Sequence, residues 1–352
     1  MDSFLDKIAF VVPVYNPPME FFRLCLESLK NQTSGNYEVI LVDDGSSNGA
    51  EDLCREYADA NDRFHVIRKE NGGVASARNA GMQAARDCKW ISFIDNDDRI
   101  REDTVEYLTT YLKDKNSDVI YFGSVRVENG NESVHVPLSY QESDSLYEEE
   151  KREILLDLVA EGYRKVNLHE GFLAVWSKVF RLDFLRENGI CFDEKLTIAD
   201  DVTFVMESIL KEKRGVAFVK EPLYIRQVDS TSDSHRYHPE IVENDGYFLD
   251  HLRRILAGRS DEEIVWAMRK RYVICLIGLI RYDICHKDNP KPFSEKVRDL
   301  RELAVRNPYR KGLEKCELKY FSKKNRLKIL LLRLKMYRTF MILEEAKNKA
   351  RR

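Results

Sequence analysis

Three carboxylates stand within four residues at Asp95, Asp97 and Asp98, directly after the apolar run of residues 90–94. The run is typical of a buried strand, and unpaired carboxylates at its end would repel each other and be costly to bury. A divalent cation would relieve both costs, because Mg²⁺ and Mn²⁺ prefer hard oxygen ligands and often hold substrate phosphates as well. The alternative is a solvated acidic turn in which Asp98 caps the next helix. The neighbouring segments favour the metal site.

Those neighbours alternate between strand and helix. Buried strands are predicted at 7–14, 37–42, 64–67 and 90–94, and helices at 21–29, 51–60 and 75–85. Such alternation indicates βαβ units and a parallel sheet, so the fold class is α/β. Ligands of open α/β sheets bind beyond the carboxyl ends of the strands. Polar residues follow the first, second and fourth strands, which places a metal–nucleotide site at that edge.

The pattern changes further along the chain. We expect a helix at 104–112, strands at 118–127 and 133–136, an acidic loop at 141–150, a helix at 201–210 and a strand at 216–219. After Pro239 the pattern is nearly all helical, with helices at 240–257, 261–285 and 293–305 and one long helix from about Lys323. The length of 352 residues suggests two domains.

Composition limits the class of protein. With 43% hydrophobic and 33% charged residues the chain is globular. The seven cysteines are scattered without a C-x-x-C pair, as in a reduced cytoplasmic protein without a zinc site. We expect neither a signal peptide nor a membrane-spanning segment. We also expect no nucleic-acid partner, and the sequence leaves the oligomeric state open.

Six motifs follow in a fixed order: PVYN (13–16), VDDGS (42–46), NGGVASARNAG (71–81), FIDNDD (93–98), VWSKVF (175–180) and ADDVTF (199–204). In this order the chain resembles glycosyltransferase family 2, whose members have the GT-A fold. The resemblance covers residues 1–235, with a nucleotide-binding half at 1–98 and an acceptor half at 99–235, and leaves 236–352 as a C-terminal helical region. It implies an inverting hexosyltransferase of surface polysaccharide synthesis, a nucleotide-sugar donor with UDP expected, a glycan or lipid-linked acceptor, and Mn²⁺ or Mg²⁺.

The resemblance assigns residues to the donor. Asp97 and Asp95 are the metal ligands. The nucleotide-binding set is Pro13, Tyr15, Asn16, Asp44, Gly73, Arg78, Asp95, Asn96 and Arg226. Several have structural alternatives. Asp44 could form an Asx-turn with Gly45, Arg78 could be a surface arginine, and Arg226 could be a solvated strand charge.

The resemblance also assigns the acceptor side. Asp201, the second acid of ADDVTF, is the general base that takes the proton from the acceptor hydroxyl. Asp200 stands where the family usually has Glu, and capping of the helix is an alternative for one of the two acids. Trp176 and Lys178 match a W-N-K pattern with Ser177 in place of Asn. Trp176 could stack on a sugar or simply pack in the core.

Other functions are less consistent with the motifs. A sugar-nucleotide pyrophosphorylase would carry a Gly/Arg-rich loop after the first strand, where this chain has Tyr15-Asn16-Pro17-Pro18. A dehydrogenase would carry G-x-G-x-x-G there. A degenerate binding subunit would have lost its acids, whereas Asp95, Asp97 and Asp201 are present.

The C-terminal segment 319–352 is strongly basic, with twelve Lys/Arg against two Glu. Its apolar residues recur at three- and four-residue steps: Leu327, Leu330, Leu331, Leu334, Tyr337 and Met341. An apolar stripe bordered by Lys and Arg is typical of a helix lying in a membrane interface. We therefore expect a cytoplasmic protein with peripheral contact at the inner face of the membrane, and packing of the stripe on preceding helices is the alternative.

Overall fold

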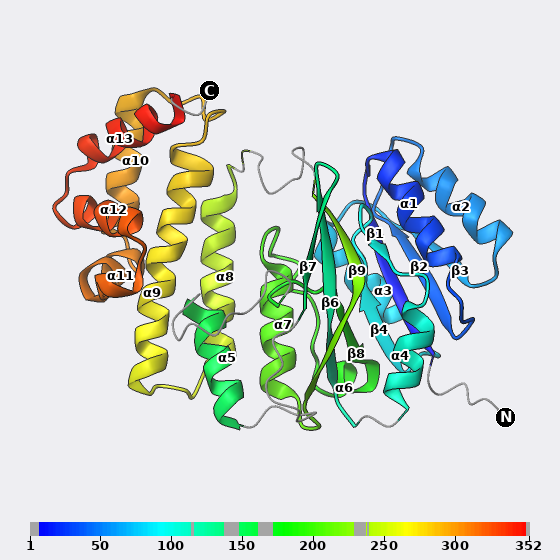
Figure 1. Cartoon of the computed structure of the whole chain (residues 1–352). Helices are drawn as coiled ribbons and strands as arrows, with labels where there is room; N and C mark the ends of the chain where they lie inside the picture. The colour runs from blue at the N-terminus through cyan, green and yellow to red at the C-terminus, as the bar shows by residue number, and fades with distance from the viewer. Residues whose placement is uncertain are drawn as a thin grey trace. The chain divides into compact units, whose positions relative to one another are not determined.

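The computed structural model describes residues 7–113, 116–136, 148–160, 172–228, 237 and 239–349. The chain forms two compact units, the first of residues 1–151 and 167–229 and the second of 152–166 and 230–352. Figure 1 shows strands and helices in the first unit and helices in the second.

The first unit contains a mixed sheet with the strand order β3-β2-β1-β4-β8-β6-β9-β5, and β7 pairs with β6. The strands of the described residues are β1 Ile8–Val14, β2 Tyr37–Asp43, β3 Phe64–Arg68, β4 Trp90–Phe93, β5 Arg99–Ile100, β6 Val119–Glu128, β7 Asn131–His135, β8 Lys178–Arg181 and β9 Val216–Val228. Strands β3, β2, β1 and β4 are parallel, as the sequence predicts. Strand β8 joins β4 to β6 and runs antiparallel to both.

Helices pack on this sheet because their apolar sides match its buried faces. They are α1 Met19–Lys30, α2 Ala50–Ala60, α3 Val74–Ala84, α4 Thr104–Leu112, α6 Leu182–Glu187 and α7 Asp200–Lys211. Every residue of β1 and β2 is buried, as expected for strands covered on both faces. Helix α3 lies so close to β1 that a Cβ atom built on Gly81 would be 2.3 Å from Cγ1 of Val11. Glycine is therefore required at this position.

The second unit is helical. Its elements are α5 Glu148–Ala160, which begins in the first unit, α8 Ile241–Ile255, α9 Glu262–Leu279 with the π-helix η3 Ile280–Ile284, α10 Phe293–Val305, α11 Tyr309–Lys315, the short η4 Leu318–Tyr320, α12 Lys323–Arg333 and α13 Tyr337–Lys349. None of the helices in the described part of the chain combines the length and apolarity that crossing a membrane requires.

The C-terminal segment differs from its prediction. The single long helix from Lys323 is wrong, because α12 ends at Arg333 and the chain turns through Lys335, whose φ is +59°. The turn divides the predicted stripe. Leu331, Tyr337 and Met341 are buried, whereas Leu327, Leu330 and Leu334 are exposed.

Two smaller predictions, the strand at 133–136 and the acidic loop at 141–150, can be compared with the structure in part. Strand β7 covers most of the strand predicted at 133–136, and it pairs with β6. The acidic loop was predicted at 141–150, and its residues 141–147 lie outside the described part of the chain, while 148–150 begin α5.

Candidate active site

The loop after β4 holds the acidic cluster, and Asp98 is its buried member. Its Oδ2 accepts a hydrogen bond of 2.6 Å from the hydroxyl of Tyr224, and its Oδ1 accepts one of 2.7 Å from the backbone N–H of Gln227. Burial and the charges of Asp95 and Asp97 raise the pKa of Asp98 well above its usual range. The alternative that Asp98 caps the next helix is wrong, because the N-cap position of α4 is Asp103.

Arg78 connects this loop to the second acidic motif. Its Nη2 lies 2.9 Å from Oδ1 of Asp95, and its Nη1 lies 2.9 Å from Oδ2 of Asp200. Both Arg78 and Asp200 are buried, so the alternative of a surface arginine is wrong. Burial lowers the pKa of Arg78, but the charges of Asp200 and Asp95 more than offset it, and the pKa is raised. A guanidinium held between two carboxylates stays charged and fixes their positions.

Asp201 lies beside this pair at the start of α7. Burial and the charge of Asp200 raise the pKa of Asp201 to about 7, against the opposing charge of Arg78. Neither acid occupies the N-cap position of α7, which is Ala199 with φ of +66°. A carboxylate with a pKa near neutrality suits proton transfer at physiological pH.

The negative charge of the loop after β4 indicates whether this loop could hold a divalent cation. Burial, followed by the charges of Asp98, Asp97 and Asp95, raises the pKa of the Cys25 thiol. Among the described residues, no three His, Cys, Asp or Glu side chains form a metal site by themselves. The carboxylates of this loop carry surplus negative charge but offer few ligands. Such a site fits Mg²⁺ or Mn²⁺, which take most of their remaining ligands from water and phosphates.

The loops after β1 and β2 are joined at the same edge. Oδ1 of Asn16 accepts a hydrogen bond of 2.8 Å from the backbone N–H of Ser47. Asp44 accepts from the N–H groups of Gly72 and Gly73 at 3.0 and 2.8 Å, and its Oδ1 lies 2.6 Å from Nζ of Lys69. The carboxylate of Asp44 is engaged by these partners rather than in the alternative Asx-turn, and the neighbouring Asp43 accepts at its Oδ1 from the N–H of Ser46, three residues on.

Three more predicted donor residues lie in or next to these loops. The side-chain amide of Asn96 donates a 2.8 Å hydrogen bond to the carbonyl of Pro13, which ties the acidic loop to β1. Tyr15 is 54% exposed, so its ring is available to a ligand. Gly73 has φ of +87°, in the left-handed region that favours glycine, and precedes the first residue of α3.

The remaining predicted residues form an aromatic and cationic group. Trp176 is buried and stacks on Tyr224 with ring centroids 5.0 Å apart, and Cζ of Arg226 lies 5.5 Å from the Trp176 centroid. Lys178 is fully buried, with Nζ 2.6 Å from the carbonyl oxygen of Ala174 and 4.3 Å from the centre of the Tyr121 ring. Burial lowers the pKa of Lys178 to about 7, against the charge of Asp201.

Sequence reasoning missed two residues of the site, Lys69 and Tyr224. Lys69 follows a short strand and lies next to Asp44, but no local pattern distinguishes it from a surface lysine. Tyr224 receives the backbone N–H of Asp95 at 3.3 Å and donates to Asp98, across 126 residues of sequence. It lies beyond the strand predicted at 216–219, and nothing in the local sequence indicates either hydrogen bond.

The chain is similar to known proteins. The family profile described as Glycosyl transferase family 2 matches residues 9–185. EpsH of Bacillus subtilis (strain 168) is 26% identical over 331 residues, covering 94% of this chain and 92% of that protein. EpsJ of the same strain is 27% identical over 313 residues, covering 84% and 83%. Both names include the word glycosyltransferase.

Solved structures show the same fold. The S. aureus protein TarS, residues 1–349, in complex with UDP-GlcNAc superimposes with a TM-score of 0.64 at 20% identity, covering 98% of this chain and 92% of that chain. The complex of the same TarS fragment with UDP gives a TM-score of 0.63 at 19% identity. The chain therefore belongs to glycosyl transferase family 2, and it is a glycosyltransferase with the GT-A fold.

Proposed function

We propose that this glycosyltransferase moves a sugar from a UDP-sugar to a saccharide acceptor of a surface polymer, by a single displacement with inversion. The observation that carries the proposal is the placement of Arg78 between Asp95 and Asp200, because it fixes the acidic loop next to Asp201. A donor-binding carboxylate and Asp200, the residue next to the candidate base, are thereby held by one buried guanidinium.

The base is Asp201. Its pKa of about 7 leaves a substantial ionised fraction at neutral pH while keeping the carboxylate basic enough to take a proton from an acceptor hydroxyl. The deprotonated oxygen attacks the anomeric carbon as the bond to the diphosphate breaks. The displacement needs no covalent nucleophile.

The donor contacts are proposed along the strand ends. Asp97 and Asp95 would hold a Mn²⁺ or Mg²⁺ ion, which supplies positive charge to the leaving diphosphate. Tyr15, Asn16 and Asp44 would contact the base and ribose, and Arg226 would contact the phosphates. Support for UDP comes from the TarS complexes with UDP and UDP-GlcNAc.

The acceptor class is supported by relatives. One of them, at 30% identity over 212 residues, is the poly(ribitol-phosphate) beta-glucosyltransferase of Bacillus spizizenii, although this chain spans only 30% of it. We propose an acceptor of the surface-polymer class, recognised by the region around Trp176, Lys178 and Asp200.

Release of nucleoside diphosphate from UDP-, GDP- and dTDP-sugars, with and without Mn²⁺ or Mg²⁺, tests the proposal. We expect metal-dependent release from a UDP-sugar, abolished in Asp97→Ala. Asp52→Ala is the control, because Asp52 is an exposed aspartate of α2. Metal-independent release, or full activity of Asp97→Ala with Mn²⁺ present, would contradict the assigned metal site.

Peripheral membrane contact through residues 319–352 also remains a proposal. It now depends on the exposed residues Leu327, Leu330 and Leu334, since the rest of the predicted stripe is buried. Salt-sensitive binding of the full chain to anionic vesicles would support it.

A further inference from the structure

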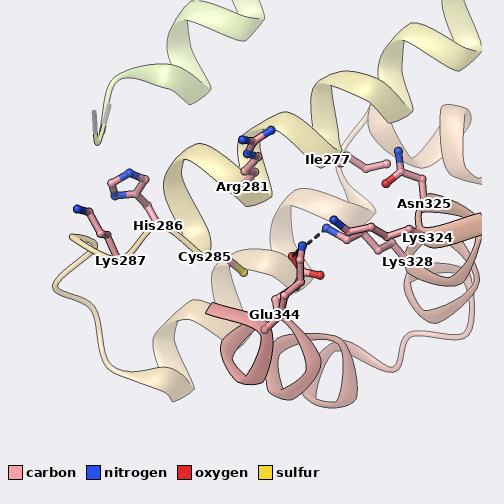
Figure 2. A pocket seen from close by; sticks show the side chains of 10 residues that line it. Ile277, Arg281, Cys285, His286, Lys287, Lys324, Asn325, Lys328 and Glu344 are labelled. Carbon is pink, nitrogen blue, oxygen red and sulfur yellow. Dashed lines mark hydrogen bonds and ion pairs between the residues drawn. The ribbon is translucent and has the colours of Figure 1, made fainter. Parts of the chain in front are cut away.

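The second unit contains a cavity of about 480 Å³ between three of its helical segments. Figure 2 shows side chains of η3 and the residues after it, of α12 and of α13 around this cavity. Its charged lining consists of the cations Arg281, Lys287, Lys324, Lys328 and Lys347 and the single carboxylate Glu344. With His286 neutral, the lining carries a surplus of four positive charges.

Glu344 neutralises only part of this charge. Its Oε2 lies 2.8 Å from Nζ of Lys328 and 3.9 Å from Nζ of Lys347. Within the described part of the chain, no ion pair engages Arg281, Lys287 or Lys324. Three cations from two segments therefore face one cavity without a compensating acid.

The lysines also crowd each other. The neighbouring side chain of Lys324, followed by burial, lowers the pKa of Lys347 to about 8, against the charge of Glu344. A neighbouring like charge raises the free energy of the protonated state. A bound anion would remove that repulsion, so the cavity is better suited to a ligand than to packing.

We propose that this cavity binds a phosphate group. Phosphate carries about two negative charges and several acceptor oxygens, which match lysines arriving from separate helices and a planar arginine donor. The cavity also lies at the N-terminal turn of α12, where Lys324 and Asn325 contribute to its lining, and a helix N-terminus favours anions.

Apolar side chains next to the cavity suggest one source of the phosphate. Leu327 follows Lys324 by three residues on α12, and Leu343 precedes Lys347 by four on α13, so each lies on the same helix face as a cavity lysine. Leu327 is 54% exposed and Leu343 is 47% exposed. A phosphate attached to a lipid would place its apolar chains against these residues, whereas free phosphate would leave them in water.

Calorimetric titration of the full chain with inorganic pyrophosphate, in the presence of a chelator, tests the proposal. Lys324→Gln and Arg281→Gln each remove one cation of the cavity. Lys335→Gln and Arg338→Gln remove matched exposed cations of the same basic segment outside the cavity. Lys324→Gln relieves the repulsion with Lys347, so we expect this variant to be at least as stable as the wild type, and loss of binding would not reflect unfolding.

We expect each cavity variant to weaken pyrophosphate binding by about tenfold or more, the loss typical of one charge-assisted hydrogen bond, while the controls change little. A second arm measures cosedimentation with phosphatidylcholine vesicles that contain phosphatidic acid. Vesicle binding that is lost in the cavity variants and displaced by pyrophosphate assigns the phosphate to a lipid. Pyrophosphate binding without vesicle binding assigns it to a free anion.

Two results would overturn the inference. One is no binding of pyrophosphate or vesicles by the wild type at low salt. The other is an equal loss in cavity and control variants, which would mean that the basic segment acts as an undivided cationic surface. All four variants should retain nucleotide release from the donor sugar, so failure here is distinguishable from failure of the proposed catalytic function.

Discussion

Replacement of Gly81 by alanine should destabilise the first unit, although alanine is the better helix former. An alanine in a helix interior gains about 1 kcal/mol over glycine. Here its Cβ would lie 2.3 and 3.0 Å from the two Cγ atoms of Val11, well inside the optimum carbon–carbon separation of about 3.5–4.0 Å. Overpacking of a dense core typically costs about 1–3 kcal/mol, so we expect Gly81→Ala to lose up to about 2 kcal/mol net.

Gly246→Ala in α8 provides the matched control. A Cβ atom there meets nothing within 4 Å, so only the helix propensity acts and the variant should gain up to about 1 kcal/mol. Val11→Ala in the Gly81→Ala background removes both clashing methyl groups. The double variant should be less destabilised than the sum of the single variants, with a coupling of about 0.5–3 kcal/mol.

Urea unfolding followed by circular dichroism, together with scanning calorimetry, measures these differences. Because α3 also carries Arg78, nucleotide release should fall with Gly81→Ala and recover partly in the double variant. A Gly81→Ala protein as stable as Gly246→Ala, or a cycle with no coupling to Val11, would refute the close approach of α3 and β1.

Four further predictions concern the active site. Transfer should rise about tenfold per pH unit below pH 7 and level off above it, because Asp201 must be ionised and its pKa is about 7. Asp200→Asn should move this profile to lower pH, since the charge of Asp200 raises the pKa of Asp201 and its loss frees Arg78; an unchanged profile would contradict the assignment. Asp201→Asn should reduce kcat by about 10²–10⁴ with donor affinity retained, and equal loss of donor binding would place Asp201 in the nucleotide site. Arg78→Met should cost about 3–5 kcal/mol in urea unfolding because it leaves the buried carboxylate of Asp200 unpaired, whereas Arg55→Met, at an exposed ion pair, should leave stability nearly unchanged.

The fold of the first unit could be predicted because its signals are local. The run of apolar residues in β1, β2 and β4 and the periodicity of α1 to α3 are each contained in a dozen residues. Strand β9 was underestimated, since Lys220, Glu221 and Pro222 interrupt its apolar pattern near a register shift against β6. The turn at Lys335 was missed because no glycine or proline marks it.

The types of the site residues could be predicted, but their partners could not. The acids at the strand ends are visible in the sequence, whereas the contact of Arg78 with Asp200 joins positions 122 residues apart. Likewise, Asp44 looks like a turn residue until its partners Lys69, Gly72 and Gly73 are known. Such contacts depend on how strands are ordered in the sheet, which short-range patterns do not specify.

The position of β8 between β4 and β6 has a consequence for synthesis of the chain. When Asp98 leaves the ribosome, β3, β2, β1 and β4 can pair. The free edge of β4 stays unpaired until residues 178–181 are synthesised, and the carboxylate of Asp98 lacks its hydrogen bond until Gln227 is synthesised. At about 5–20 residues per second, the 129 residues between Asp98 and Gln227 take about 6–26 s to translate. During that interval the nascent chain exposes the unpaired edge of β4, and the carboxylates of the β4 loop are not yet in their active-site arrangement.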